Sequence, residues 1–357
     1  MPERRDADLE QAIAAQVRDA AARRQALYIQ GGGSKRALLG RDCEAAVLDV
    51  SGHCGITDYQ PAELVLSARA GTPLSALQAE LAAQEQELPF EPPTFRGRAT
   101  LGGTLACNLS GPARPWRGSI RDLVLGVRLI DASGECLRFG GKVMKNVAGY
   151  DVSRLQAGAL GTLGVLTEIT VKVLPRAQRT VTLAYELPAA EAIQMMNRRA
   201  ATAAPMTGAC WLDGRLYLRL AGEAGAVAHT ARRWGGESLA AGDDLWRDLR
   251  EMRLSFFAGD APLWRLSVKP SAMLAGPPAQ LLDWGGAQRW LRGEFELTQL
   301  QQFASAAGGH VTLFRGGDRR GEVRPFPGEV QQRLQQRLKH SFDPQGIFNP
   351  GRLYGWL

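Results

Sequence analysis

The sequence lacks the features that mark membrane-spanning and secreted proteins. No run of about 18 apolar residues occurs in its 357 residues, so we expect no transmembrane helix. The opening stretch MPERRDADLEQ contains no apolar segment of the kind found in secretory signals. We therefore expect a cytoplasmic protein.

Cysteine and histidine are scarce, which argues against most metal centres. The five cysteines form no C-x-x-C pair, and their odd number favours reduced thiols over a disulfide framework. Their spacing also excludes an iron–sulfur cluster held by this chain alone. No two of the four histidines stand at the spacing of metal ligands, so we expect no metal site.

The positive charge is present but not concentrated. The formal net charge is +7, and the arginines behind it are spread along the chain without a dense basic block. Nucleic-acid binding is therefore only weakly indicated, and we expect none. A basic face for an acidic protein partner or for an anionic substrate is equally compatible with this charge.

What is present suggests an α+β protein with more than one domain. Apolar residues recur at helical spacing over 9–24 and over 72–86, where Thr72 is the expected N-cap and Pro73 the first helical residue. Residues 122–141 read as a hairpin, and 329–342 as a helix. Strands and helices alternate after Pro175, which predicts one sheet with helices on one face. We expect domains at 1–175, 176–330 and 331–357, the last being a helix and a tail that returns to the first domain.

Three glycine-rich segments are the main functional signal. The segment YIQGGGSK follows an expected strand, and its glycines let backbone N–H groups converge on an anion, although a simple turn is as good an interpretation of this segment alone. It does not match the Walker A spacing, and GALGTLG is not a dinucleotide fingerprint. The small residues of the segments ATLGGTLACNLSG and AGALGTLGVLTEI would likewise let a ligand lie close to the backbone. Together they indicate a long cofactor with phosphates at one end and a ring at the other.

These segments resemble one family. The stretches GGGSK, ATLGGTLACNLSGPARPWRGS, GGKVMKNVAGYDVSRLQAGALGTLGVLTEI and DPQGIFNPGRLY are similar to FAD-linked oxidases of the vanillyl-alcohol-oxidase type, with the PCMH flavin fold. Within that family the chain most resembles the FAD-binding E-type subunits of bacterial glycolate oxidases. The likeness is dense from Tyr28 to Pro175, faint in the middle and present again at the C-terminus. It implies a PCMH-type FAD-binding domain of two α/β subdomains, followed by a smaller α+β cap.

The resemblance implies roles for individual residues. The pyrophosphate loop corresponds to Gly31, Gly32, Gly33, Ser34 and Lys35. The stretch along the pyrophosphate and the isoalloxazine corresponds to Pro93, Thr100, Leu101, Gly102, Gly103, Ala106, Ser110 and Gly111. The segment around the adenosine half corresponds to Asp151, Gly161, Thr162, Gly164 and Val165, and the tail that returns to the ring to Asn349 and Pro350.

The residues for substrate chemistry are less visible. Oxidation of a 2-hydroxy acid at a flavin needs a cation for the carboxylate and a base for the hydroxyl proton. We expect His310 as the base and Arg315 as the carboxylate clamp, although a structural histidine beside a surface arginine is the simpler interpretation.

One departure from the family bears on the partners. Related catalytic subunits carry a GHxGDGN-type metal segment, where this chain has only GGHVTLFRG. The resemblance therefore implies a sister FAD-containing catalytic subunit of the D type and an iron–sulfur subunit of the F type, with glycolate as substrate. Any membrane contact would be peripheral, on the inner face of the cytoplasmic membrane, through these partners. A stand-alone 2-hydroxyacid dehydrogenase and a flavin-free scaffold subunit are the alternatives.

Overall fold

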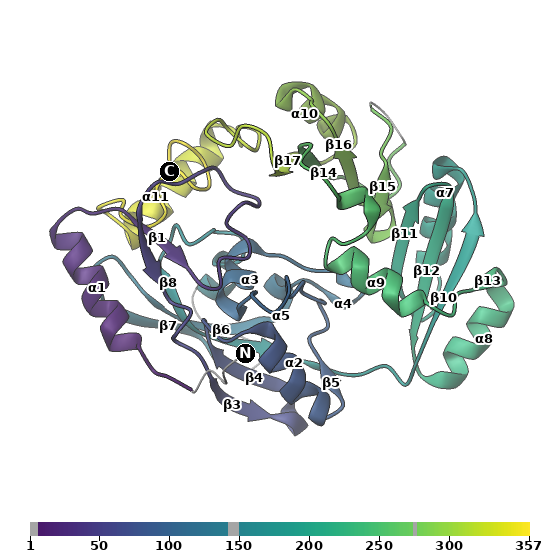
Figure 1. Ribbon diagram of the computed structural model, residues 1–357, viewed down its shortest axis with the longest axis horizontal. Helices are drawn as coiled ribbons and strands as arrows, with labels where there is room; N and C mark the ends of the chain where they lie inside the picture. The colour runs from purple at the N-terminus through teal and green to yellow at the C-terminus, as the bar shows by residue number, and fades with distance from the viewer. Residues whose placement is uncertain (1–5, 142–149, 274–276) are drawn as a thin grey trace.

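The computed structural model describes residues 6–141, 150–273 and 277–357, and shows two halves that are each built around a sheet (Figure 1). The first half contains a five-stranded sheet with strand order β3-β4-β8-β6-β7, in which all neighbours are antiparallel. Its strands are β3 (Ile56–Gln60), β4 (Val65–Arg69), β6 (Val124–Ile130), β7 (Cys136–Gly140) and β8 (Val165–Lys172). The expected hairpin is therefore confirmed, since β6 pairs with β7.

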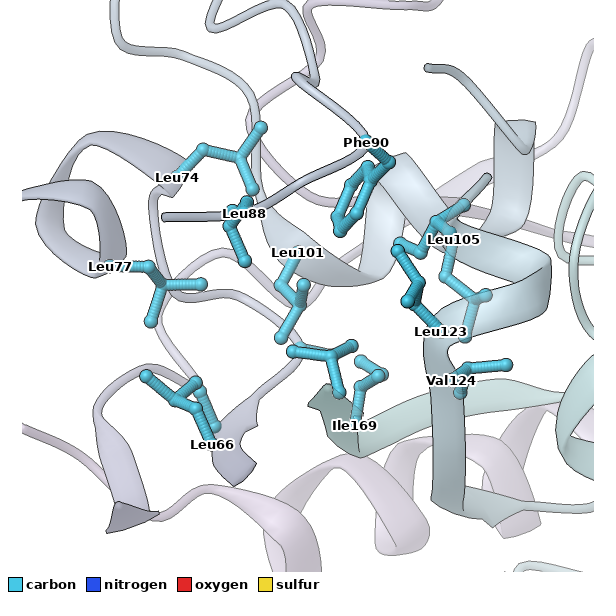
Figure 2. Close-up of a cluster of buried hydrophobic side chains, with 14 of the residues drawn as sticks. Leu66, Leu74, Leu77, Leu88, Phe90, Leu101, Leu105, Leu123, Val124 and Ile169 are labelled. Carbon is cyan, nitrogen blue, oxygen red and sulfur yellow. The ribbon is translucent and has the colours of Figure 1, made fainter. Parts of the chain in front are cut away.

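Short helices cover this sheet. They are α2 (Leu74–Ala83), α3 (Leu101–Cys107), α5 (Ile120–Leu123) and α6 (Val152–Leu155), whereas α4 (Arg114–Arg117) packs against the second half of the molecule. Leucines of α2 and α3 pack against Leu66 of β4 and Ile169 of β8 in one apolar core (Figure 2). Helix α2 begins one residue later than expected. Pro73 is its N-cap, and the Thr72 hydroxyl instead exchanges hydrogen bonds with the backbone of Gly55.

Two small sheets complete the first half. Strand β1 (Leu27–Gln30) pairs in parallel with β2 (Ala46–Asp49), and β5 (Gln86–Glu87) pairs with β9 (Leu174–Pro175). Helix α1 (Glu10–Ala22) buries Ile13 and Val17 beside β1 and β2, because these residues stand four apart on one face.

The second half contains an eight-stranded antiparallel sheet, with strand order β13-β10-β12-β11-β15-β16-β14-β17. Its strands are β10 (Arg179–Glu186), β11 (Met206–Leu212), β12 (Arg215–Gly222), β13 (Glu237–Ser238), β14 (Leu263–Ser267), β15 (Leu281–Asp283), β16 (Gln288–Arg292) and β17 (His310–Arg315). The sheet begins seven residues after the end of β8. The boundaries at 175 and 330 stay predictions.

Helices lie on both faces of this sheet, which corrects the expectation of one covered face. Helices α7 (Ala189–Ala200), α8 (Ala224–Trp234) and α10 (Leu297–Ala306) pack on one face. Helix α9 (Gly242–Arg250) packs on the other, where Trp246 and Leu249 join the core that also holds Leu109 of the first half. The sequence pattern could not show this, because an amphipathic helix does not specify which face of a sheet it covers.

The C-terminal tail returns to the first half of the molecule. Helix α11 (Glu329–Phe342) leads into a tail whose Ile347 and Phe348 are buried against α1, β1 and β2. The Leu27 amide donates to the Ile347 carbonyl (2.7 Å), and the Asn349 amide donates to the Leu27 carbonyl (2.8 Å). The tail therefore lies alongside β1, directly before the triple glycine.

Candidate functional site

The triple glycine forms a loop that is pressed against a neighbouring segment. A Cβ atom on Gly32 would lie 1.7 Å from the carbonyl oxygen of Arg98, and one on Gly31 would lie 2.5 Å from the hydroxyl of Thr100. Both glycines are thus required by the protein's own packing, in addition to any role toward a ligand. The loop and the start of α3 are held face to face in this way.

Helix α3 presents its N-terminus to this loop. Thr100 is its N-cap and accepts a hydrogen bond from the Gly103 amide. Gly102 is packed against Ala70, whose Cβ would lie 2.7 Å from an added Cβ. Gly103 has more space, since the nearest atoms to an added Cβ would be the Thr100 hydroxyl at 3.2 Å and the Lys35 ammonium at 3.8 Å.

A cavity of about 740 Å³ opens between these segments. Most of the expected cofactor residues line it, namely Gly31, Gly32, Gly33, Ser34, Lys35, Thr100, Gly102, Gly103, Ala106, Gly161, Gly164 and Asn349. Pro93, Ser110 and Gly111 instead line a separate cavity of about 400 Å³. Leu101, Thr162 and Val165 are buried in the protein, and Asp151 caps helix α6 at the surface. Residues 142–149 of the GGKVMKNVAGYD motif lie outside the described residues.

Lys35 supplies a buried positive charge to the first cavity. It is 8% exposed, and its ammonium group lies 3.4 Å from the Ser34 hydroxyl and 5.7 Å from the centre of the Phe95 ring. Its ammonium has no carboxylate partner in the described part of the chain. Burial therefore lowers the pKa of Lys35 to about 8. A buried, unpartnered cation beside a glycine-lined cradle suits an anionic group such as a pyrophosphate.

The C-terminal tail closes the same cavity. The side chain of Asn349 accepts from the Ile29 amide (2.7 Å) and donates to the Leu160 carbonyl (2.6 Å). Arg352, a residue that the sequence interpretation missed, is 4% exposed and donates to the carbonyls of Arg36 (2.7 Å) and Leu38 (3.1 Å). It holds the chain that leaves the glycine loop. Only its closeness to the predicted tail residues could have drawn attention to it.

A second cavity, of about 1120 Å³, adjoins the first and shares Cys107 and Leu160 with it. Arg265 of β14, Arg324 and His310 of β17 line it. Neither arginine has a carboxylate partner among the residues that the structure describes. The Arg324 guanidinium donates to the Leu39 carbonyl (2.6 Å), and that of Arg265 lies 5.3 Å from the centre of the Phe314 ring.

Burial shapes the charge of this second cavity. It lowers the pKa of Arg265 to about 10, which still leaves the guanidinium charged at neutral pH. The pKa of His310 is lowered first by desolvation and then by the nearby charges of Arg265 and Arg324. The second cavity therefore combines two arginines that have no carboxylate partner among the described residues with a histidine whose pKa is lowered.

Arg315, the expected carboxylate clamp, lies outside both of these cavities. Its guanidinium donates to the carbonyls of Phe257 (2.5 Å) and Gly259 (3.5 Å). Arg315 and His310 stand at opposite ends of β17, where Arg315 pairs with Leu263 and His310 with Ser267 of β14. The guanidinium of Arg315 is directed to the segment at residues 257–259, and Arg265 and Arg324 are the arginines that line the cavity with His310.

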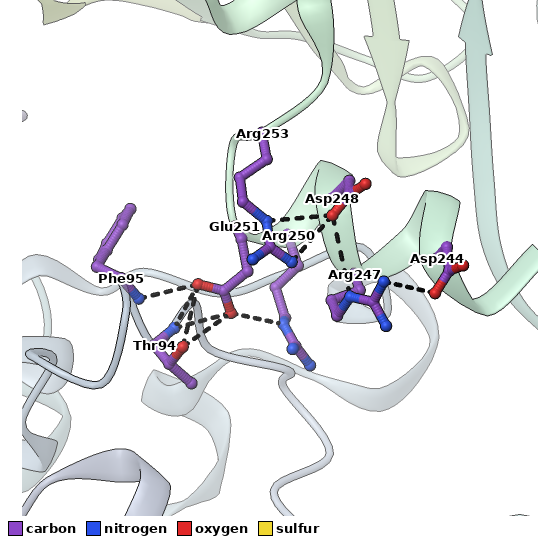
Figure 3. Close-up of polar contacts among 8 residues, drawn as sticks. All are labelled: Thr94, Phe95, Asp244, Arg247, Asp248, Arg250, Glu251 and Arg253. Carbon is purple, nitrogen blue, oxygen red and sulfur yellow. Dashed lines mark hydrogen bonds and ion pairs between the residues drawn. The ribbon is translucent and has the colours of Figure 1, made fainter.

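Polar contacts join the two halves beside the cavities. The Glu251 carboxylate, directly after α9, accepts hydrogen bonds from the amides of Thr94 (3.0 Å) and Phe95 (2.9 Å) (Figure 3). The Trp284 indole donates to the Gly111 carbonyl (3.0 Å), and Arg219 pairs with Glu91 (2.9 Å).

Known proteins resemble this chain over its whole length. The family described as FAD binding domain matches residues 7–140. Glycolate oxidase subunit GlcE of Escherichia coli is 46% identical over 354 residues, which cover 99% of each chain. D-lactate dehydrogenase of Archaeoglobus fulgidus is 24% identical over 79% of this chain and 76% of its own. Glycolate oxidase subunit GlcD of Bacillus subtilis is 42% identical over only 85 residues, 24% of this chain and 18% of its own.

Solved structures share the fold. Two structures of alkyldihydroxyacetonephosphate synthase superpose with TM-scores of 0.62 and 0.64, at 15% and 14% identity, over 95% of this chain and 74% of theirs. At that identity the likeness concerns the fold alone.

The α+β architecture, the matching domain and the glycine-lined cavity place the chain in the class of FAD-linked oxidoreductases of the PCMH type, with FAD as the cofactor. Within that class, the chain belongs to the family of glycolate oxidase subunit GlcE. In the described ranges no helix is long and apolar enough to cross a membrane. No group of three or more possible metal-ligating side chains occurs in those ranges either.

Proposed function

We propose that this chain is the FAD-binding subunit of a glycolate (D-2-hydroxyacid) oxidase complex, and that it passes electrons from 2-hydroxyacid oxidation to an iron–sulfur partner subunit. The observation that carries the proposal is the 46% identity to subunit GlcE over nearly the whole chain. The glycine-lined cavity with its buried lysine is the independent structural support.

The first cavity would hold FAD through residues from three parts of the chain. The amides of Gly31 to Ser34 and of the α3 N-terminus would receive the pyrophosphate, and Lys35 would balance its charge. The remaining predicted cofactor residues, in the loops that carry Ser110 and Gly161 and in the tail at Asn349, would contact the other parts of FAD. When bound, FAD supplies the hydride acceptor, while the protein supplies position and charge.

A second candidate function is that this chain oxidises the hydroxy acid itself. The observation that favours it is the pair of uncompensated arginines beside the FAD cavity. Arg265 and Arg324 would bind the substrate carboxylate, since charge-assisted hydrogen bonds from a guanidinium to a carboxylate are stronger than neutral ones. The neutral His310 would take the hydroxyl proton, as its lowered pKa keeps a nitrogen lone pair free at neutral pH.

The onward path of electrons would run through a second polypeptide. The described residues form no disulfide, and they contain no group of three or more side chains that could hold a metal centre. Glycolate oxidase subunits of two kinds, GlcE and GlcD, are among its relatives. We propose a sister flavoprotein and an iron–sulfur subunit as the partners, with any membrane contact made through them.

A visible spectrum of the purified chain, followed by anaerobic addition of glycolate, tests both functions. Flavin bands are expected from the first cavity, and a folded chain that cannot bind FAD would overturn the proposed function. Bleaching by glycolate would assign substrate oxidation to this chain. In that case Arg265→Ala and Arg324→Ala should each raise the glycolate concentration needed by about tenfold or more, from the loss of one charged hydrogen bond.

Arg315→Ala is the matched control, because Arg315 lies outside the cavity. If its effect equals that of Arg265→Ala, the proposed clamp is wrong. If the spectrum of the isolated chain stays oxidised while the whole complex oxidises glycolate, the sister subunit performs the oxidation and this FAD relays the electrons.

A further inference from the structure

A basic groove lies between the two halves, separate from the second cavity. It has a volume of about 820 Å³, and one of its walls is the loop at residues 94–98. The other wall is the end of α9 and the residues that follow it. The lining includes five arginines and one acidic residue, namely Arg96, Arg98, Arg247, Arg250, Arg253 and Glu251.

The acidic residue of the groove is already engaged. The Glu251 side chain is 6% exposed, and its oxygens accept from the amides of Thr94 and Phe95, from the Thr94 hydroxyl and from the Arg250 guanidinium (Figure 3). Glu251 thus fixes one wall of the groove to the other, and its charge is not available to a ligand.

The arginines differ in how far their charge is compensated. On the α9 wall, Arg247 pairs with Asp244 (2.5 Å) and Arg253 with Asp248 (2.9 Å) (Figure 3). On the loop wall, Arg96 and Arg98 are exposed and form no ion pair with any residue that the structure describes. The unbalanced charge of the groove therefore lies on the loop wall.

The loop wall also has an unusual backbone conformation. Phe95, Arg96 and Gly97 have φ values of +46°, +59° and +76°, three successive residues in the left-handed region. Non-glycine residues in that region are strained, and the loop is held there by the hydrogen bonds that the Thr94 and Phe95 amides donate to Glu251 and by the bond from the Ala99 amide to the Thr94 carbonyl. The two arginines are presented on a rigid rather than a loose segment.

The groove adjoins the cofactor cavity. Ser34 lines both spaces. Phe95 lines the groove, and its ring packs against the ammonium of Lys35, which lines the cavity. A protein bound in the groove would therefore sit close to the phosphate loop that the proposed function assigns to FAD.

We propose that this groove docks an acidic segment of a partner subunit of the oxidase; the proposal rests on the proposed function. The exposed, partly paired arginines on two walls suit an extended acidic surface, whose many screened contacts steer and orient association. A small anion is better served by Arg265 and Arg324 of the second cavity, which are less exposed than Arg96 and Arg98. Arginine is also enriched at protein interfaces.

The test is a charge reversal in the co-expressed complex. The double variant Arg96→Glu/Arg98→Glu is produced together with the sister flavoprotein and iron–sulfur subunits, and the affinity of the purified chain for them is measured at several salt concentrations. We expect about tenfold weaker association at low salt and a shallower salt dependence, with unchanged FAD content and melting temperature. The matched control is Arg232→Glu/Arg233→Glu, an exposed pair on α8, on the opposite face of the second sheet.

The outcomes separate the groove from the proposed function. Wild-type association combined with an unaffected double variant overturns the groove alone, as does an equal effect of the α8 control. Loss of FAD from the double variant would assign the groove to the cofactor site and also overturn docking. A wild-type chain that binds neither subunit overturns the proposed complex and the groove together, whereas the spectrum of the isolated chain still tests FAD binding.

Discussion

At the scale of single residues, the glycines of the cofactor cavity do two different jobs. Gly32 is required because the Arg98 carbonyl occupies the space of its side chain, whereas the side-chain space of Gly103 faces the cavity. The sequence leaves both a cofactor role and a simple turn open for these glycines, and packing against the protein's own backbone is a further reason for glycine at position 32. Contact with backbone requires glycine at position 32, whereas at position 103 we expect the cofactor to require it.

Gly103→Val should therefore remove FAD without unfolding the chain. The added methyl groups would enter the space between Thr100 and Lys35, where we place the pyrophosphate. We expect loss of the flavin absorbance with a far-UV spectrum and melting temperature close to those of cofactor-free wild type. Full flavin occupancy in this variant would exclude the pyrophosphate from that space.

Gly32→Val serves as the contrasting variant. Its side chain would collide with backbone at 1.7 Å, so the loop at residues 94–98 must move. We expect destabilisation of about 2 kcal/mol or more as well as loss of FAD, since overpacking typically costs 1–3 kcal/mol. An unchanged melting temperature would contradict the tight packing of these two loops.

The buried Lys35 should make both the stability of the cofactor-free protein and its affinity for FAD depend on pH. Its pKa is lowered to about 8 in the folded, cofactor-free chain and is about 10.4 in an unfolded chain. Between these pH values the unfolded state binds the extra proton, so the stability of the cofactor-free protein should rise with pH from about 8 to about 10. FAD affinity should fall over the same range, because the neutral amine no longer balances the pyrophosphate.

Lys35→Met tests this assignment. The variant should lose both trends, which chemical denaturation and FAD titration at several pH values would show. A wild-type protein whose FAD affinity does not change between pH 7 and 10 would argue against contact between Lys35 and the phosphates.

At the scale of elements, the sequence predicted local structure better than position. The leucines at 74, 77 and 81 stand on one helical face, and α2 forms there and buries them. The turn after Ile130 and the flanking apolar residues likewise predicted β6 and β7. These signals are local, so a reader of the sequence can find them.

The two arginines that we propose as the carboxylate clamp could not be found in this way. Arg265 lies in the middle of a strand and Arg324 in an irregular segment, and nothing in their sequence neighbours distinguishes them from the other arginines. They meet His310 only because β14 pairs with β17 and because the segment after β17 folds back over Leu39. Such an arrangement depends on the tertiary fold rather than on any spacing in the sequence.

Glu251, directly after α9, should stabilise the contact between the two halves. Glu251→Gln keeps the size of the side chain but replaces one acceptor oxygen with an amide that faces the N–H groups of Thr94 and Phe95. We expect a loss of about 1–3 kcal/mol, the cost of leaving buried donors unsatisfied. Denaturant unfolding would measure this loss.

Asp244→Asn is the matched control for Glu251→Gln, because Asp244 also belongs to α9 and its ion pair with Arg247 is exposed on both sides. It should change stability by less than about 0.5 kcal/mol. Equal effects of the two variants would mean that Glu251 contributes no more than a surface ion pair.

At the scale of the whole molecule, the cofactor cavity is built from distant parts of the chain. Its walls come from the segment after β1, from α3 and the loop before β8, and from the tail at Asn349 and Arg352. The second half is tied to the first by Glu251, Trp284 and Arg219, which do not line this cavity. A ligand in the cavity therefore contacts segments of the first half and the C-terminal tail that are far apart in the sequence.

FAD should consequently stabilise the whole chain, and Arg352 should decide how strongly. Binding to the folded state adds about 2.7 kcal/mol at a free FAD concentration of 100 times Kd. We expect a single thermal transition that rises with FAD concentration, because the contacts of Glu251, Trp284 and Arg219 join the second half to the half that binds FAD. Arg352→Ala frees the carbonyls after the glycine loop, so the FAD-dependent rise should shrink while the transition stays single. Two separate transitions, with only one of them sensitive to FAD, would show that the halves unfold independently and that the contacts between them are weak.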